Sequence, residues 1–280
     1  MPYTAEISRA NPSCIVILID QSGSMEDPFG QGTAGKRKAD GVADAVNRLL
    51  QNLVIKCAKS EGIRDYYHVG VLGYGDRGVG AAFTGPLAGR ELVPISDIAN
   101  NPARVEQRSK KVDDGVGGII EQKIKFPIWL DPLYKGGTPM CEALRQAKRL
   151  VTDWIRQHVG CFPPIVINIT DGEATDGNAE PVADEIKRLS SEDGHVLLFN
   201  LHISSSAHAA VEFPDDQSML PDDYARLLFR MSSPLPDYMW TMVQEEGIII
   251  CEHPKGFVFN ADLVSVIRFL SIGTRPSNLR

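Results

Sequence analysis

The chain lacks the features that several large protein classes require. Positive charge is not in excess, because 29 lysines and arginines face 36 aspartates and glutamates, giving a formal net charge of −7. That balance disfavours electrostatic binding to nucleic acid or to an anionic membrane surface. The longer apolar runs, such as residues 14–19 and 165–169, fall far short of the roughly 18 residues that a membrane span needs. We therefore expect a soluble protein with no membrane span and no nucleic-acid partner.

Cysteine is scarce as well. The five cysteines contain no C-x-x-C pair and form an odd set, which disfavours a zinc site or a disulfide framework. The first fourteen residues show no basic segment followed by an apolar one, so we expect no secretory signal. We interpret the cysteines as reduced thiols, mostly in the core of a cytoplasmic protein. They are Cys14, Cys57, Cys141, Cys161 and Cys251.

What the chain does contain is an alternation of strand and helix patterns. Continuous β-branched runs predict strands that are buried on both faces, and apolar residues at helical spacing predict amphipathic helices. The expected strands are residues 14–20, 68–74, 164–170, 196–203 and 248–251; the expected helices are residues 36–60, 140–155, 182–189, 222–231, 237–246 and a last one from an N-cap at Asn260 to about Leu270. Such alternation predicts an α/β fold with a mainly parallel central sheet and helices on both faces.

One region interrupts this alternation. Residues 76–134 are rich in glycine, proline and polar residues, and a structureless loop of that length is improbable in a compact domain. We expect an insertion with its own strands or hairpins that extends the sheet edge, with Pro127 and Pro132 arguing against a central strand. The tail, residues 273–280, carries no recognised chemistry.

Oxygen-bearing side chains follow the predicted strands where ligands bind in open α/β sheets. Asp20, Ser22 and Ser24 stand at the carboxyl end of the first strand. Thr138 lies in Gly-Gly-Thr-Pro before a long helix, and Asp171 follows another buried strand in Ile-Thr-Asp-Gly. Carboxylates and hydroxyls of this kind suit a hard divalent cation.

This set resembles the von Willebrand factor A (vWA) family, whose metal-ion-dependent adhesion site reads Asp-x-Ser-x-Ser, then a distant Thr, then a distant Asp at a strand end. The resemblance covers most of the chain and implies a single domain over residues 1–280 with a Rossmann-like three-layer α/β/α fold. It also implies Mg²⁺, with Mn²⁺ and Ca²⁺ as alternatives, bound directly by Ser22 and Ser24. Thr138 and the two aspartates would alternate between direct and water-mediated contact. The chain looks most like bacterial intracellular members linked to tellurite resistance and conflict systems.

The chemistry of such a site predicts protein binding. Two carboxylates balance the ion while neutral hydroxyls leave it electrophilic, with a coordination position for an Asp or Glu of a partner protein. We expect a non-enzymatic adhesion or adaptor module, and the resemblance implies an AAA+ ATPase, kinase or phosphatase of the same system as partner. Two alternatives stay open: a metal-dependent phosphoryl-transfer enzyme, and a self-associating structural protein bridged by the metal, with residues 212–216 as the donor.

Several other patterns have a simpler interpretation. Residues 30–37 imitate a phosphate-binding loop, but position 37 is Arg where that loop needs Ser or Thr. A haloacid-dehalogenase-type phosphatase would need an acid at Ser22. We interpret the histidines as structural. The acidic residues Glu173, Asp176 and Asp184 are interpreted as solvated, and the alternative is a second cation site. The basic cluster Lys36, Arg37 and Lys38 is interpreted as a solvated helix end, and the alternative is contact with a partner.

Overall fold

The computed structural model describes residues 2–29, 35–113, 119–204, 210–249 and 252–274. Its centre is an eight-stranded sheet with the order β13-β14-β12-β9-β1-β4-β5, and β6 also pairs with β4. The five strands from β14 to β4 are parallel, and β13, β5 and β6 join the two edges antiparallel. The strands of this sheet are β1 (Ser13–Asp20), β4 (Tyr67–Gly75), β5 (Gly78–Ala81), β6 (Val93–Pro94), β9 (Ile165–Thr170), β12 (Leu197–Ile203), β13 (Val211–Glu212) and β14 (Phe257–Ala261).

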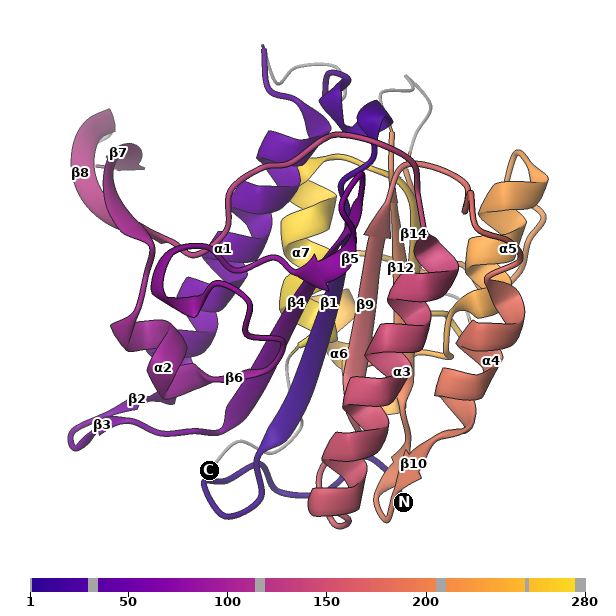
Figure 1. Ribbon diagram of the computed structural model, residues 1–280, viewed down its shortest axis with the longest axis horizontal. Helices are drawn as coiled ribbons and strands as arrows, with labels where there is room; N and C mark the ends of the chain where they lie inside the picture. Colours follow the sequence, from indigo (N-terminus) through magenta and orange to yellow (C-terminus); the bar gives the residue numbers. More distant parts are fainter. Residues whose placement is uncertain (1, 30–34, 114–118, 205–209, 250–251, 275–280) are drawn as a thin grey trace.

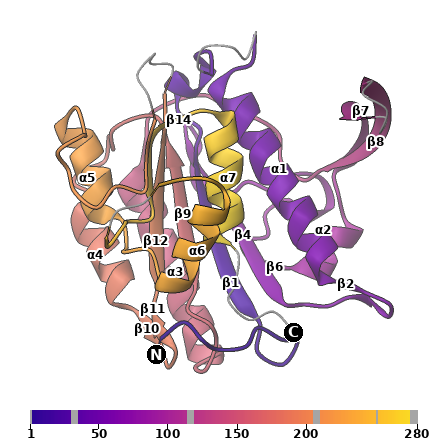
Figure 2. The ribbon, with the colours of Figure 1, turned by 180° about the vertical axis from the view of Figure 1, so that it is seen from behind.

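Helices cover both faces of the sheet, so the predicted three-layer α/β architecture is confirmed. Figures 1 and 2 show α3, α4 and α5 on one face and α1, α6 and α7 on the other. The helices are α1 (Lys38–Cys57), α2 (Ile95–Asn100), α3 (Met140–Gln157), α4 (Glu180–Arg188), α5 (Asp223–Met231), α6 (Asp237–Glu245) and α7 (Leu263–Gly273). Short two-stranded ribbons are formed by β2 (Ala58–Lys59) with β3 (Gly62–Ile63), and by β10 (Ser190–Ser191) with β11 (Gly194–His195).

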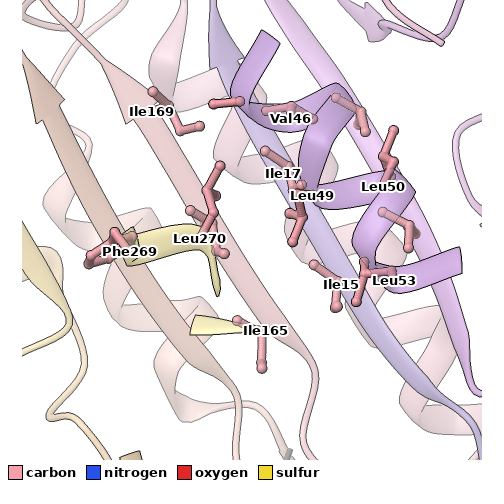
Figure 3. Close-up of a cluster of buried hydrophobic side chains, with 14 of the residues drawn as sticks. Ile15, Ile17, Val46, Leu49, Leu50, Leu53, Ile165, Ile169, Phe269 and Leu270 are labelled. Carbon is pink, nitrogen blue, oxygen red and sulfur yellow. The ribbon is translucent and has the colours of Figure 1, made fainter. Parts of the chain in front are cut away.

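The central strand β1 explains why the sequence reads as an unbroken apolar run. Every residue of β1 is buried, because successive side chains enter two different cores. Ile15 and Ile17 join the core beneath α1 and α7, whereas Val16 and Leu18 join the core beneath α3. Figure 3 shows Ile15 and Ile17 against the α1 side chains, among them Leu53. The two cores fix β1 and hold its carboxyl end in place.

The region of residues 76–134 forms the insertion that the sequence predicts. It contributes β5 and β6 to the sheet edge, and its strands β7 (Arg104–Asp113) and β8 (Ile119–Ile128) form a separate antiparallel hairpin. Pro127 lies in this hairpin and not in the central sheet. Both ribbon views show the hairpin projecting from the body beside α1 (Figures 1 and 2).

The last part of the chain differs from the prediction in two places. Ile248 and Ile249 are not in a strand, and residues 250–251 lie outside the described residues. The strand is β14 instead, and Asn260 belongs to it. Asp262 is the N-cap of α7, accepting a hydrogen bond from the backbone N–H of Ser265 at 2.8 Å. Of the predicted tail, residues 275–280 lie outside the described residues.

The cysteines and helix lengths agree with the sequence interpretation where they are described. Cys14, Cys57, Cys141 and Cys161 are free and buried, and Cys251 lies outside the described residues. Within the described part of the chain, every helix is too short or too polar to cross a membrane.

Candidate metal centre

The candidate residues lie on three loops at the carboxyl edge of the sheet, at the top of Figure 1. Asp20 is the last residue of β1, Ser22 is the N-cap of the 3₁₀ helix Gly23–Glu26, and Ser24 lies in that helix. Asp171 comes directly after β9, and Thr138 precedes α3. Because β1 and β9 are parallel neighbours, their carboxyl ends meet at this edge.

Backbone hydrogen bonds tie the three loops together. The N–H of Gly23 donates to the carbonyl of Gly136 at 2.9 Å, which joins the first loop to the second. The N–H of Thr175 donates to the carbonyl of Thr138 at 2.9 Å, which joins the third loop to the second. Gly136 has a φ of 89°, and a Cβ there would lie 2.4 Å from the Cα of Asp76. Only glycine fits this position, so the sequence Gly-Gly-Thr-Pro serves the loop geometry directly.

The structure brings several of the candidate side-chain oxygens close together. Ser22 Oγ lies 3.1 Å from Ser24 Oγ, and the Ser24 hydroxyl donates to Asp171 Oδ1 at 2.7 Å. A Cβ placed on Gly172 would lie 3.7 Å from Thr138 Oγ1 and 3.8 Å from Ser24 Oγ, so these oxygens face the same point. Hydroxyls and carboxylates from three loops thus share one small volume.

The spacing of the two serine oxygens suits octahedral coordination. Mg²⁺ holds oxygen ligands at 2.0–2.1 Å, so two ligands in adjacent octahedral positions are about 2.9 Å apart. The observed Ser22–Ser24 separation of 3.1 Å is close to this value before any adjustment. The donor set, with hydroxyls and carboxylates and no sulfur or imidazole, is the kind that Mg²⁺ prefers. These residues therefore fit the ion that the resemblance implies.

Asp20 is held rigidly beneath the serines. Its side chain is inaccessible to solvent, the N–H of Ser22 donates to Oδ1 at 2.9 Å, and the Thr170 hydroxyl donates to Oδ2 at 2.7 Å. Burial raises the pKa of Asp20 to about 6, against the lowering effect of these hydrogen bonds. Sequence reasoning missed Thr170, although it stands beside Asp171 in the same motif.

Lys38 is the largest departure from the sequence interpretation. It was expected in a solvated helix end, yet it is only 5% exposed. Its Nζ donates to Asp171 Oδ2 at 2.8 Å, and the Asp171 side chain is itself fully enclosed. A cation in the first turn of a helix opposes the helix dipole, so its presence there was a signal that an anion faces it.

The other charged residues singled out from the sequence have local partners. Lys36 pairs with Asp44 at 2.8 Å, and Arg37 pairs with Asp40 at 2.9 Å. Asp176 accepts hydrogen bonds from the N–H groups of Cys141 and Glu142 at the start of α3, at 3.0 and 2.9 Å. Partial burial raises the pKa of Asp176, but these hydrogen bonds lower it by more, so the net pKa lies below its usual range. Asp184 pairs with Lys187, and Glu173 is exposed. Within the described residues there is no group of three or more His, Cys, Asp or Glu side chains that could hold a metal.

His202 and Tyr224 pack beneath the site and are already engaged. The His202 ring stacks on Phe259 with centroids 4.6 Å apart, and its Nδ1 accepts from the N–H of Asn260. Burial lowers the pKa of His202 to about 4, so the ring is neutral. The Tyr224 hydroxyl donates to the carbonyl of Gly172. His202 is therefore a structural histidine, as the sequence suggested.

A cavity of about 570 Å³ lies far from these residues. It is lined by the start of β12 and by residues near Tyr238, at the opposite edge of the sheet. None of the candidate metal residues takes part in it.

Comparison with known proteins finds limited structural similarity to solved structures. No protein-family model matches the sequence, and no curated protein matches it. Among solved structures, proximal thread matrix protein 1 from the mussel byssus is 17% identical with a TM-score of 0.42, over 80% of this chain and 42% of that one. The vWF domain of the type V pili tip protein Mfa5 from Porphyromonas gingivalis is 18% identical with a TM-score of 0.30, over 59% of this chain and 39% of that one. At this level of similarity the function has to be inferred from the site itself.

Proposed function

We propose that this protein is a magnesium-dependent protein-binding module that captures an aspartate or glutamate side chain of a partner. The observation that supports it most is the convergence of the predicted oxygens, above all the 3.1 Å between Ser22 Oγ and Ser24 Oγ. Ser22, Ser24 and Thr138 would hold the ion through hydroxyls, while Asp20 and Asp171 supply negative charge. Mn²⁺ and Ca²⁺ are the alternative ions.

The site is open to an incoming ligand on the side of Ser24, whereas Ser22 and Thr138 are buried. Ser24 is exposed, and so are the neighbouring Gly23, Gly136 and Gly137. Glycines carry no side chain that would obstruct the approach of another protein to the site. A carboxylate is a hard anionic ligand and suits an ion that keeps an open coordination position.

The proposal assigns the site to binding and not to catalysis. Phosphoryl transfer would require a group that moves a proton close to the ion. The two titratable groups packed beneath it, His202 and Tyr224, are committed to Asn260 and Gly172. Their engagement supports a site that holds a ligand without transforming it.

The cellular setting is part of the same proposal. Free buried thiols are typical of reducing compartments, which supports the cytoplasm. The motif resemblance to bacterial intracellular vWA proteins supports a partner such as an AAA+ ATPase, kinase or phosphatase of one assembly.

Affinity capture in two buffers tests the proposal. Immobilised protein is incubated with a lysate of the source organism in Mg²⁺ or in EDTA, and retained proteins are identified and purified. We expect retention by the wild type in Mg²⁺, loss in EDTA or with Ser22→Ala/Ser24→Ala, and loss when one Asp or Glu of the partner is replaced. Asp153→Ala, at a partly exposed position on α3, is the matched control. Retention that is indifferent to EDTA and to the serine variant contradicts the proposal.

Two further measurements separate the alternatives. Hydrolysis of phosphoesters that disappears in Asp20→Ala would favour the enzyme. An Mg²⁺-dependent doubling of mass in light scattering would favour self-association. Within residues 212–216, the expected donor segment for self-association, Glu212 pairs with Arg268 at 3.3 Å in its own chain.

A further inference from the structure

Lys38 places a buried ammonium group beside Asp171, although a metal ion can bind without such a group. It begins α1, and its backbone N–H donates to the carbonyl of Asp27 at 2.9 Å, which anchors the first turn to the loop after β1. Its Nζ reaches three acceptors: Asp171 Oδ2 at 2.8 Å, the carbonyl of Ser24 at 3.4 Å and Asp27 Oδ2 at 3.5 Å. An ammonium with three donors and three acceptors, in a side chain that is 6% exposed, is fixed in place.

The two oxygens of the Asp171 carboxylate have different partners. Oδ1 accepts from the Ser24 hydroxyl, and Oδ2 accepts from Lys38. Lys38 and the Ser24 hydroxyl therefore contact different oxygens of Asp171, so a cation at Oδ1 and the lysine at Oδ2 can contact the carboxylate at the same time. The ammonium is a second positive charge beside the site and not a blocker of the hydroxyls.

The formal charges follow from this arrangement. Asp20 and Asp171 contribute two negative charges, and Lys38 cancels one of them. Asp27 also lies near the ammonium, but its side chain is 59% exposed and its charge is screened by water. With a divalent ion bound, the enclosed part of the site carries a net charge of about +1, which one carboxylate neutralises.

We propose that Lys38 is a permanent positive charge beside the metal centre. It weakens metal binding, and it favours the binding of one anionic ligand once the metal is bound. This inference rests on the proposed function. Before the ion binds, Lys38 compensates the enclosed Asp171 and keeps the loops assembled. After it binds, the repulsion between the two cations lowers the affinity for the metal and favours a carboxylate over a neutral ligand.

Three variants separate charge from shape. Lys38→Met keeps the length of the side chain without its charge, Lys38→Gln keeps a neutral donor for Asp171, and Lys36→Met removes a nearby exposed lysine as control. Metal-free protein is titrated with Mg²⁺ by calorimetry and melted in EDTA. Lys38→Gln carries the test if Lys38→Met does not fold.

We expect Lys38→Met and Lys38→Gln to bind Mg²⁺ roughly tenfold more tightly than the wild type, as removal of one nearby charge implies. In EDTA both should melt at a lower temperature, since Asp171 loses its counter-ion, and Lys36→Met should match the wild type. Simple structural damage would lower the melting temperature without tightening Mg²⁺ binding.

A carboxylate probe tests the charge balance of the loaded site. Replacing chloride by acetate at equal ionic strength should strengthen apparent Mg²⁺ binding in the wild type more than in Lys38→Gln. An equal acetate effect, or variants that bind Mg²⁺ no more tightly than the wild type, overturns the inference while leaving the proposed function intact. If the wild type does not bind Mg²⁺ and Lys38→Gln does, the lysine takes the place of the metal, and both proposals are wrong.

Discussion

The hydroxyl of Ser24 donates a hydrogen bond to Oδ1 of Asp171 at 2.7 Å, although 147 residues separate the two in the sequence. The bond joins the loop after β1 to the loop after β9. Both partners belong to the protein, so this bond itself helps to hold the two loops close together. Such preorganisation lowers the cost of assembling the ligands around an ion.

Replacing Ser24 by alanine should remove both the hydrogen bond to Asp171 and one proposed metal ligand, and their effects can be measured separately. Loss of the hydrogen bond from the exposed Ser24 to the enclosed Asp171 carboxylate should lower the free energy of unfolding in EDTA by about 1–2 kcal/mol. The variant should also lose its response to Mg²⁺, because one direct ligand is gone. Urea unfolding with and without Mg²⁺ measures both, and Ser218→Ala, at an exposed position outside the site, should leave the response to Mg²⁺ unchanged. A Ser24→Ala protein that still gains stability from Mg²⁺ would contradict the assignment.

Magnesium should stabilise the native protein through Asp20. An ion that binds only the folded state at a hundredfold excess over its Kd adds about 2.7 kcal/mol, which corresponds to roughly 5 °C in melting temperature. Asp20→Asn should abolish this increase because the amide carries no charge, while Asp153→Asn should keep it. Scanning calorimetry in Mg²⁺ and in EDTA checks the pair. An equal increase in both variants would place the ion elsewhere.

The second loop should depend on Gly136. An alanine Cβ at this position would collide with the backbone of Asp76, and φ is positive as well. Gly136→Ala should therefore displace Thr138 and weaken Mg²⁺ binding at least tenfold, as calorimetric titration would show. Gly89 also has a positive φ, of 79°, but open space around it. Gly89→Ala should cost about 1 kcal/mol of stability through its backbone alone and leave Mg²⁺ binding unchanged, so equal binding by both variants would exclude a role for this loop.

A chain of buried hydrogen bonds crosses the sheet beneath the site. Tyr74 donates to Asn168 at 2.7 Å, Asn168 to Asn200 at 3.1 Å, and Asn200 to Ser232 at 3.0 Å. Tyr74→Phe leaves the Asn168 carbonyl without this donor and should cost about 1–3 kcal/mol.

Tyr67 supplies a matched control for this prediction. Its buried hydroxyl has no hydrogen-bond partner among the described residues. Tyr67→Phe should therefore leave the free energy of unfolding unchanged or raise it. Urea unfolding of the two variants should separate them, and equal losses would mean that the network adds nothing beyond packing.

The buried His202 should make stability depend on pH. Because its folded pKa of about 4 lies below its ordinary value near 6.5, the unfolded chain takes up a proton first as the pH falls. The contribution of His202 is complete above pH 6.5 and is lost as the pH falls towards about 4, by up to about 3 kcal/mol.

A His202→Gln variant isolates this effect from the titration of other groups. The difference in unfolding free energy between wild type and variant should shrink steadily between pH 6.5 and 4. A difference that stays constant over this range would show that the imidazole is not held neutral by burial.

The sequence predicted the parts of the fold that rest on local pattern. An unbroken β-branched run predicts that Ile15 and Val16 face opposite sides of a buried sheet. The positions of the three oxygen-bearing loops are predicted because polar residues follow directly after the apolar strands. The strand Phe257–Ala261 was missed because its five residues follow a turn without a long apolar run, while the isoleucines at 248–250 imitate one. Its pairing with β12 is a tertiary contact that no local pattern records.

The sequence pattern identified the candidate oxygens of the site but not the residues that support them. Aspartate, serine and threonine at strand ends carry the chemistry by residue type. Lys38 and Thr170 act only through the residues they touch, and those contacts join segments far apart in the chain. A lysine near a helix start looks the same in sequence whether it is solvated or enclosed, so only its neighbours distinguish the two.

The most direct test is a crystal of the protein grown with Mn²⁺ and measured at the manganese absorption edge. The account predicts one strong anomalous peak about 2.2 Å from Ser22 Oγ and Ser24 Oγ, with Lys38 still on Asp171. A structure at saturating Mn²⁺ without a peak between the two serines, or with the peak elsewhere, would contradict it.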